Sequence, residues 1–332
     1  MKILFYATNQ DISLGPYRIW GNDLNQYMQE IGHSSKLYTG SPKEVEEADV
    51  IIFAKNDWKD SIKVKEYYPE KIIGTTNLSA DISSKVSCDF VIVGSLEEKC
   101  SLSKYQNVFL YPLIEKMFQS EDLYKIHEPK DRLTIGFHGS YTHLAKFYPY
   151  LYKAIERFDK EQDIALKIIT SSGFIWNSAP NIKNIDIIPW DYKTMAEEII
   201  SCDIGVVPNI TPISLRDISS TRTSVNQGLY ESDFISRYKN KSNAGRAFVF
   251  HQLGVPVIAD LTPSNFHILG DERNGYIAHD DESWVKALRK LSDYKTRQET
   301  ADNAKKEFDR LYDPHEWAKI LYNNIEGLKN DI

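Results

Sequence analysis

The chain has 332 residues, 42% of them hydrophobic, so it is long enough for two domains that each bury a core of ordinary size. Its formal net charge of −7 at pH 7 argues against general nucleic-acid binding, which needs a basic surface. Three cysteines without metal-ligand spacing favour a reduced, cytoplasmic protein with neither a zinc site nor a disulfide framework.

The first predicted element is a strand over residues 2–8, in a run that is too short for a signal peptide. No run in the chain approaches the ~20 apolar residues of a spanning helix, although the sequence leaves peripheral contact with the inner face of a membrane open. A polar loop with Asp11, Gly15 and Arg18 follows, in which Gly15 and Pro16 act as helix breakers. The next helix has its apolar residues on one face: Trp20, Leu24, Tyr27, Met28 and Ile31.

Strand, loop, helix and strand in this order predict a doubly wound sheet, in which ligands bind at the carboxyl ends of the strands. The first loop lacks the G-x-G-x-x-G pattern, which disfavours an NAD enzyme. Three further buried strands end in polar residues, which are expected to line one cleft: Lys55, Asp57, Asn77, Asp81, Ser95 and Glu97. The alternative for each of them is a polar residue that merely leaves a strand. The charged segment 116–131 then reads as an interdomain linker.

The second half opens with a strand over 133–137 and the loop His138, Gly139, Ser140, Tyr141 and Thr142. A glycine lets a backbone come close to a ligand, and its neighbours offer hydrogen-bond donors. A histidine in such a loop is more often structural than catalytic.

Trp190 leaves a later strand, where two roles fit equally: stacking on a nucleobase or covering the core. After the strand 203–208 comes a segment of about thirty residues, 209–238, rich in Ser, Thr and Arg. Loops of this length are generally functional or disordered, so a lid over a nucleotide and a protein contact are both open.

The stretch 239–260 reads as a basic loop, a short helix that ends at Gly254, and a buried strand. The start of the helix is crowded with polar and basic residues: Lys241, Ser242, Asn243 and Arg246. A helix N-terminus offers unpaired N–H groups and a partial positive charge, so these residues predict an anion site, most naturally for phosphate. The alternative is a capped surface helix with solvated charges.

Two or three helices are expected at the C-terminal end of the sequence, and two of them have clear starts. Asp281 is predicted to cap the first, and Asp313 with Pro314 to open the second. The buried stripe of the last helix is predicted to be Trp317, Ile320, Leu321 and Ile325.

The phrases DIGVVP, GVPVIA and GDERNGYIAHDDESWVKAL resemble the C-terminal domain of GT-B glycosyltransferases of the "glycosyl transferases group 1", family 4-like, superfamily. The resemblance covers residues 132–325, whereas 1–115 are similar mainly in pattern. It implies an α/β fold with two Rossmann-like doubly wound domains that face a central cleft. The implied domains are an acceptor-side domain (1–115 with the helix 313–332), the linker 116–131, and a nucleotide-sugar-binding domain (132–312).

The sequence departs from the family at one point. The family carries two glutamates around the donor-site helix, and in this sequence Lys241 and Val249 stand at their positions. The usual ribose ligand is thereby lost, and the K-S-N-x-x-R form resembles a divergent branch. The resemblance implies Lys241, Arg246 and Asp11 as catalytic candidates. The implied donor-binding residues are Gly15, Arg18, His138, Gly139, Ser140, Tyr141, Trp190, Ser242 and Asn243, of which Gly15 and Arg18 would come from the N-terminal domain.

The expected reaction is transfer of a sugar from a nucleotide sugar, most naturally a UDP-sugar, to a glycan, lipid-linked or protein acceptor, without a cofactor. The chain contains no Asp-x-Asp motif, which favours metal-independent chemistry in which a helix dipole and basic side chains stabilise the leaving diphosphate. A base, needed only by an inverting enzyme, is sought among Asp11, Asp57 and Asp81. A nucleotide-sugar epimerase and a non-catalytic nucleotide-sugar-binding protein remain as alternatives. The sugar, the base, the acceptor, the stereochemical outcome and the oligomeric state stay open.

Overall fold

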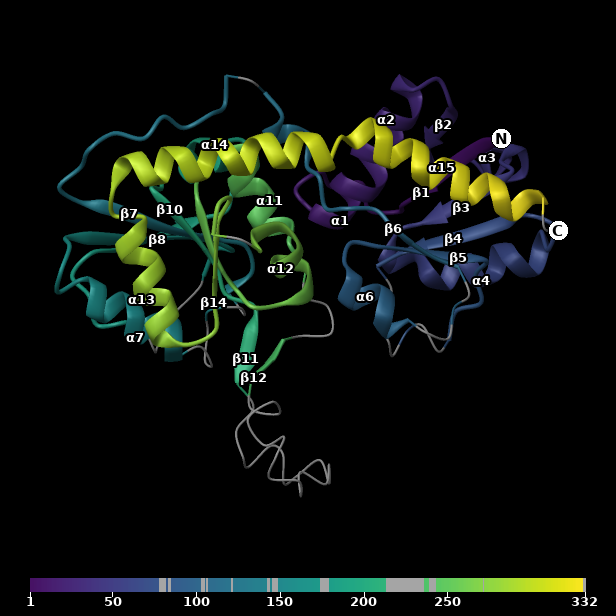
Figure 1. Cartoon of the computed structure of the whole chain (residues 1–332). Coiled ribbons are helices and arrows are strands. Elements are labelled where there is room, and N and C mark those ends of the chain that lie inside the picture. Colours follow the sequence, from purple (N-terminus) through teal and green to yellow (C-terminus); the bar gives the residue numbers. More distant parts are fainter. Residues whose placement is uncertain are drawn as a thin grey trace, which may run out of the picture. The chain divides into compact units, whose positions relative to one another are not determined.

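The structure, a computed structural model, describes residues 1–77, 82, 85–102, 105, 107–120, 122–141, 144, 149–173, 179–212, 236–238, 243–270 and 272–330. The chain divides into two compact units, one of Met1–Gln119 with Asp309–Ile332 and one of Ser120–Phe308. Each is built on a six-stranded parallel sheet with interleaved helices, as Figure 1 shows. The chain therefore has the predicted α/β class.

The sheet of the first unit has the strand order β2-β1-β3-β4-β5-β6. Its strands are β1 Lys2–Tyr6, β2 Ser34–Leu37, β3 Val50–Phe53, β4 Ile72–Thr76, β5 Phe90–Val93 and β6 Val108–Leu110. Its described helices are α1 Gly15–Tyr17, η1 Arg18–Asp23, α2 Leu24–Glu30, α3 Pro42–Glu47, η2 Lys55–Asp57, α4 Trp58–Tyr67, α6 Leu96–Ser101, η3 Lys116–Phe118 and α15 Pro314–Asn330.

Both faces of this sheet are buried, and helices α2 and α15 lie on one side with α4 and α6 on the other (Figure 1). Successive residues of a strand point to opposite faces. Ile3 accordingly packs in one cluster with Leu321 of α15, whereas Leu4 packs in another with Val45 of α3. The need for apolar residues on both faces explains the continuous hydrophobic runs that made these strands predictable.

The closing helix α15 belongs to the first unit and packs against α2 and β6. Its buried face is formed by Ala318, Leu321, Tyr322 and Ile325. The prediction for Ile320 is wrong, because its side chain is 45% exposed. At 100° per residue, Ile320 lies well outside the arc that these four residues span.

The first helical segment begins earlier than predicted. Gly15 and Pro16 are its first residues rather than part of the loop, and Pro is well tolerated in the first turn of a helix, where no backbone donor is lost. The segment then continues as the π-helix η1, a form that is rare in proteins.

The sheet of the second unit has the order β14-β13-β10-β7-β8-β9, all parallel. Its strands are β7 Leu133–His138, β8 Ile164–Thr170, β9 Ile185–Pro189, β10 Ile204–Val207, β13 Val257–Asp260 and β14 Tyr276–Ala278. Its described helices are α7 Pro149–Phe158, α8 Met195–Ile200, α11 Gly245–Gln252, α12 Pro263–Leu269, α13 Asp281–Lys290 and α14 Tyr294–Leu311. A separate antiparallel ribbon pairs β11 Ile210–Pro212 with β12 Ser236–Tyr238. Residues 213–235 of the predicted lid or contact segment lie outside the described residues.

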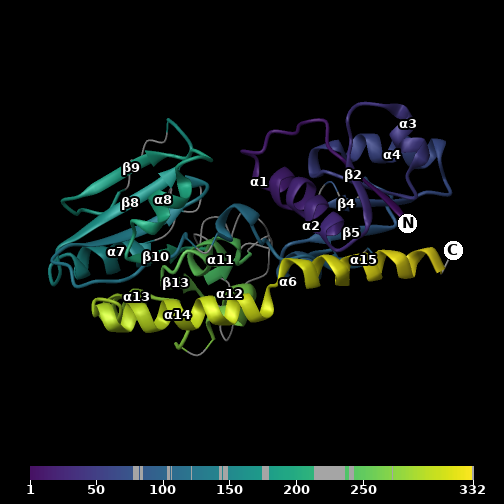
Figure 2. The same cartoon turned by 90° about the horizontal axis from the view of Figure 1, so that it is seen from above.

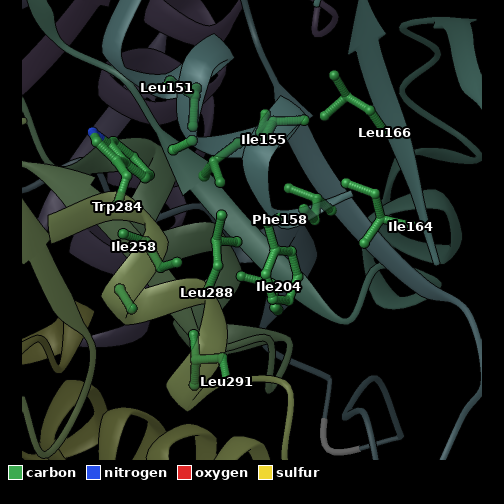
Figure 3. Packing of buried hydrophobic residues seen from close by; sticks show 14 of the residues in the cluster. Leu151, Ile155, Phe158, Ile164, Leu166, Ile204, Ile258, Trp284, Leu288 and Leu291 are labelled. Carbon is green, nitrogen blue, oxygen red and sulfur yellow. The ribbon is translucent and has the colours of Figure 1, made fainter. Parts of the chain in front are cut away.

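Helices α7 and α13 lie side by side on one face of this sheet (Figures 1 and 2). Figure 3 shows Trp284 and Leu288 of α13 packed with Leu151 and Ile155 of α7 over the strand residue Ile258. The helix α13 starts as a capping box on Asp280, which accepts a hydrogen bond from the Ser283 N–H at 2.8 Å. The predicted cap, Asp281, is instead the first helical residue.

On the opposite face, α11 approaches the sheet closely because Gly205 of β10 has no side chain. A Cβ at Gly205 would lie 2.7 Å from the Phe250 ring. Gly254, at φ +71°, ends the helix as predicted, since this left-handed conformation favours glycine. No helix among the described residues is both long and apolar enough to cross a membrane.

Candidate functional site

The carboxyl ends of β7, β8 and β9 are tied together by three hydrogen bonds. The Gly139 N–H donates to the Ile169 carbonyl at 3.0 Å, and the Thr170 hydroxyl donates to the Gly139 carbonyl at 2.8 Å. The Trp190 N–H in turn donates to the Thr170 carbonyl at 2.6 Å. Gly139 has φ +112°, so the turn after β7 uses a conformation that L side chains rarely adopt.

Arg246 is the second residue of α11, and its side chain runs beside this turn. A Cβ at Gly139 would lie 3.3 Å from the Arg246 Cδ. The guanidinium carbon lies 5.6 Å from the centre of the Phe137 ring, in the range of a cation–π contact. Burial lowers the pKa of Arg246, although the guanidinium stays a cation at neutral pH. The structure thus brings together Gly139, Arg246 and the N–H groups that begin α11, a combination suited to an anion.

His138 is buried beneath Gly139 and Arg246 rather than exposed beside them. Its ring is 3% exposed and stacks edge-on to Phe250 with 4.9 Å between ring centres. Its Nε2 lies 3.2 Å from the Arg246 carbonyl oxygen, which can only accept, so Nε2 carries the hydrogen. Burial lowers the pKa of His138 to about 3, so the ring is neutral. This geometry gives His138 a structural role in holding the start of α11, and donor contact by its side chain stays a prediction.

Asn209 contacts Arg246, and two further polar residues bond the main chain nearby. The Asn209 Oδ1 accepts a hydrogen bond from the Arg246 Nη2, and the Asn209 N–H donates to the carboxylate of Asp260. The Asn243 Oδ1 accepts from the Gly245 N–H at 3.2 Å. Asn209 and Asp260 were not among the predicted site residues. Their signal in the sequence is a single polar residue at the end of each of two buried strands.

The remaining predicted residues of this unit differ in exposure. Ser140 and Tyr141 are exposed, and Trp190 is half-buried, so all three can be reached from solvent. Lys241, Ser242 and Thr142 lie outside the described residues, and their roles stay predictions.

Arg18 in the first unit is buried, with 4% exposure, and is paired with Glu115. Its Nε lies 3.0 Å from the Glu115 Oε2, and its Nη1 donates to the Ile12 carbonyl at 2.8 Å and the Ser13 carbonyl at 3.2 Å. Burial raises the pKa of Glu115 despite the nearby guanidinium. Arg18 therefore fixes the loop between β1 and α1, and Gly15, the first residue of α1, lies beside its guanidinium. Phosphate binding by either residue stays a prediction.

The three candidate bases have different surroundings. Asp11 is exposed, and hydrogen bonds from Ser13 lower its pKa, which makes it a weaker base at neutral pH. Asp57 is buried and accepts hydrogen bonds from the hydroxyl and the N–H of Thr8. These bonds hold the loop that follows β1. Asp81 lies outside the described residues. Nothing in this geometry selects a base.

A narrow pocket of about 10 Å³ opens at the carboxyl ends of β1, β3 and β4 in the first unit. It has room for about one water molecule. Its lining is mostly apolar and includes the aromatic residues Tyr6, Tyr17 and Trp20. Among the described residues no group of three or more His, Cys, Asp or Glu side chains is arranged to hold a metal ion.

No family model matches the sequence, and no curated protein matches it. Several solved structures match its fold at low sequence identity. Sucrose-phosphate synthase from Thermosynechococcus elongatus matches over 100% of both chains, with a TM-score of 0.64 and 13% identity. A glycosyltransferase from Rickettsia africae ESF-5 matches over 99% of both chains, with a TM-score of 0.62 and 10% identity. Anabaena Alr3699/HepE in complex with UDP-glucose matches over 98% of this chain and 100% of its own, with a TM-score of 0.61 and 11% identity. The chain therefore has the GT-B fold, as the sequence phrases implied.

Proposed function

We propose that the protein is a glycosyltransferase that takes a sugar from a UDP-sugar. The observation that carries the proposal is the position of Arg246, at the start of α11 and against the positive-φ turn at Gly139. The N-terminal N–H groups of the helix and the guanidinium can both stabilise the charge that develops on a departing diphosphate. A fold-level match to a protein solved with UDP-glucose supports uridine as the base.

Half-buried Trp190, at the exit of β9, is the candidate surface for the nucleobase. Gly139, Ser140, Tyr141 and Asn243 would then lie along the diphosphate and sugar. From the sequence, Lys241 adds a second cation before α11. The first unit would hold the acceptor, which is a glycan, a lipid-linked saccharide or a protein.

We further propose that transfer needs no metal ion. The reason is chemical: without an Asp-x-Asp motif in the chain, the counter-charge to the diphosphate has to come from other groups, and Arg246 and the helix start supply it. Chelation with EDTA should leave the rate of sugar transfer unchanged, whereas a reversible loss of activity would overturn this part of the proposal.

The test is calorimetric titration of UDP into the wild type and into an Arg246→Ala variant. Loss of a charge-assisted contact should weaken UDP binding by about 10- to 100-fold. A parallel assay of UDP release from a panel of UDP-sugars reports turnover. Equal UDP affinity in both proteins would remove Arg246 from the site. UDP binding without turnover of any donor would instead favour a nucleotide-sugar-binding protein.

A further inference from the structure

Asn209 lies at the carboxyl end of β10, with its side chain in contact with α11. The residue is 3% exposed, and its Oδ1 accepts a hydrogen bond from the Arg246 Nη2. Its Nδ2 lies 3.5 Å from the Asn243 carbonyl oxygen. A guanidinium only donates and a carbonyl oxygen only accepts, so the two partners fix which way the Asn209 amide faces.

The main chain of Asn209 is fixed as well. Its N–H donates to the carboxylate of Asp260, which is fully buried at the end of the neighbouring strand β13. Val207 and Ala259 are the last register partners on these two strands, so the Asp260 side chain holds the chain just beyond the end of the pairing. The Asn265 side chain of α12 donates to the Asp260 carbonyl at 2.9 Å and thereby holds the main chain of Asp260 in place.

An amide oxygen orients a guanidinium but adds no negative charge to it, unlike a carboxylate. A residue that must present positive charge to a diphosphate is better held by an amide. The hydrogen bond to Asn209 can therefore orient the Arg246 guanidinium without neutralising its charge.

We infer that Asn209 is a positioning residue of the donor site, which holds the Arg246 guanidinium beside the Gly139 turn, and that Asp260 fixes the main chain of Asn209. The inference rests on the proposed function, since it concerns how the diphosphate of the donor is bound. Asn209 acts through Arg246, so its effect on UDP binding depends on Arg246 being present.

The test is a double-mutant cycle with UDP as the ligand, measured by calorimetry on the full chain. Asn209→Ala should weaken UDP binding by about tenfold, because Arg246 then samples directions away from the ligand. In the Arg246→Ala background the same change should alter the affinity by less than about twofold. If the losses from the two single changes multiply in the double variant, Asn209 does not act through Arg246 and the inference is wrong.

Asn184→Ala is the matched control. Asn184 also bonds a main-chain carbonyl, that of Ile164 at 3.2 Å, but it precedes β9, an edge strand that is separated from β10 by β7 and β8. Its replacement should leave UDP affinity unchanged. If Asn209→Ala does not fold, Asn209→Ser replaces it in the cycle, because serine keeps a polar group but is too short to reach Arg246. If the wild type does not bind UDP, the proposed function fails and the inference falls with it.

Discussion

The His127 ring should make the stability of the second unit depend on pH between about 6.5 and 4. The ring is 4% exposed, and its Nε2 lies 3.0 Å from the Gly254 carbonyl, while the Arg297 Nε lies 3.4 Å from its Nδ1. The carbonyl can only accept and Arg297 can only donate, so the neutral ring with hydrogen on Nε2 satisfies both. A protonated ring would lose the contact with Arg297 and face its positive charge.

Burial, helped by the charges of Lys125 and Arg297, lowers the pKa of His127 from 6.5 to about 4. The unfolded chain therefore binds a proton as the pH falls through about 6.5, whereas the folded protein does not until about 4. The contribution of His127 to stability is complete above this window and is lost as the pH falls through it. At pH 5 the medium is 1.5 units below the unfolded pKa, and at 1.36 kcal/mol per unit the loss is about 2 kcal/mol.

The perturbation is His127→Gln, which keeps an N–H donor for the Gly254 carbonyl and does not titrate. Urea denaturation followed by circular dichroism, at pH 7 and at pH 5, gives the free energy of unfolding of both proteins. The difference between wild type and variant should shrink by about 2 kcal/mol at pH 5, because titrating groups shared by the two proteins cancel. His267→Gln, on the exposed side of α12, should follow the wild-type curve at both pH values. A difference that is the same at pH 7 and pH 5 would refute the reasoning.

Three further outcomes are expected. Lys241→Ala should slow sugar transfer by about 10²–10³-fold with an unchanged melting temperature, and a wild-type rate would exclude Lys241 from the chemistry. Arg18→Met should lower the free energy of unfolding by about 3–5 kcal/mol because it leaves Glu115 buried without its cation, and adding Glu115→Leu should restore most of the loss in urea denaturation. Gly139→Ala should cost about 1–3 kcal/mol from its φ of +112° and also weaken UDP binding by displacing Arg246. Gly173→Ala, at φ +78° and with no atom of the described residues within 4 Å of the added Cβ, should cost stability alone.

The strands were predictable because both faces of each sheet are covered, which forces long apolar runs such as Val50–Phe53. Helix boundaries were less predictable. Pro16 is compatible with a loop and with the first turn of a helix, and the choice depends on packing that the local sequence does not contain. The misplaced Ile320 has the same origin, since apolar residues on the last helix exceed the arc that α2 and the sheet can cover.

In the candidate site, local signals were informative and long-range ones were not. Gly139 and Arg246 carry their own signals, a glycine in a strand-to-helix turn and a cation at a helix start, and the structure brings them together. The partner of Arg18 could not be predicted, because Glu115 is 97 residues away in the chain. Asn209 was missed for a related reason: its meaning depends on Arg246 and Asp260, which reach it only through the order of the strands.

Because α15 packs in the first unit, the two units complete their cores in a different order from their order in the sequence. The first unit fills its core with Leu321 and Ile325, which a ribosome adds some 200 residues after Gln119 completes the N-terminal part of that unit. The second unit is one continuous stretch, Ser120–Phe308, and is complete before α15 emerges. During synthesis the sheet of the first unit is therefore made before the second unit but completes its core after it, and its apolar face stays uncovered until α15 is added. A chaperone that protects nascent apolar surface would find its longest-lived target there.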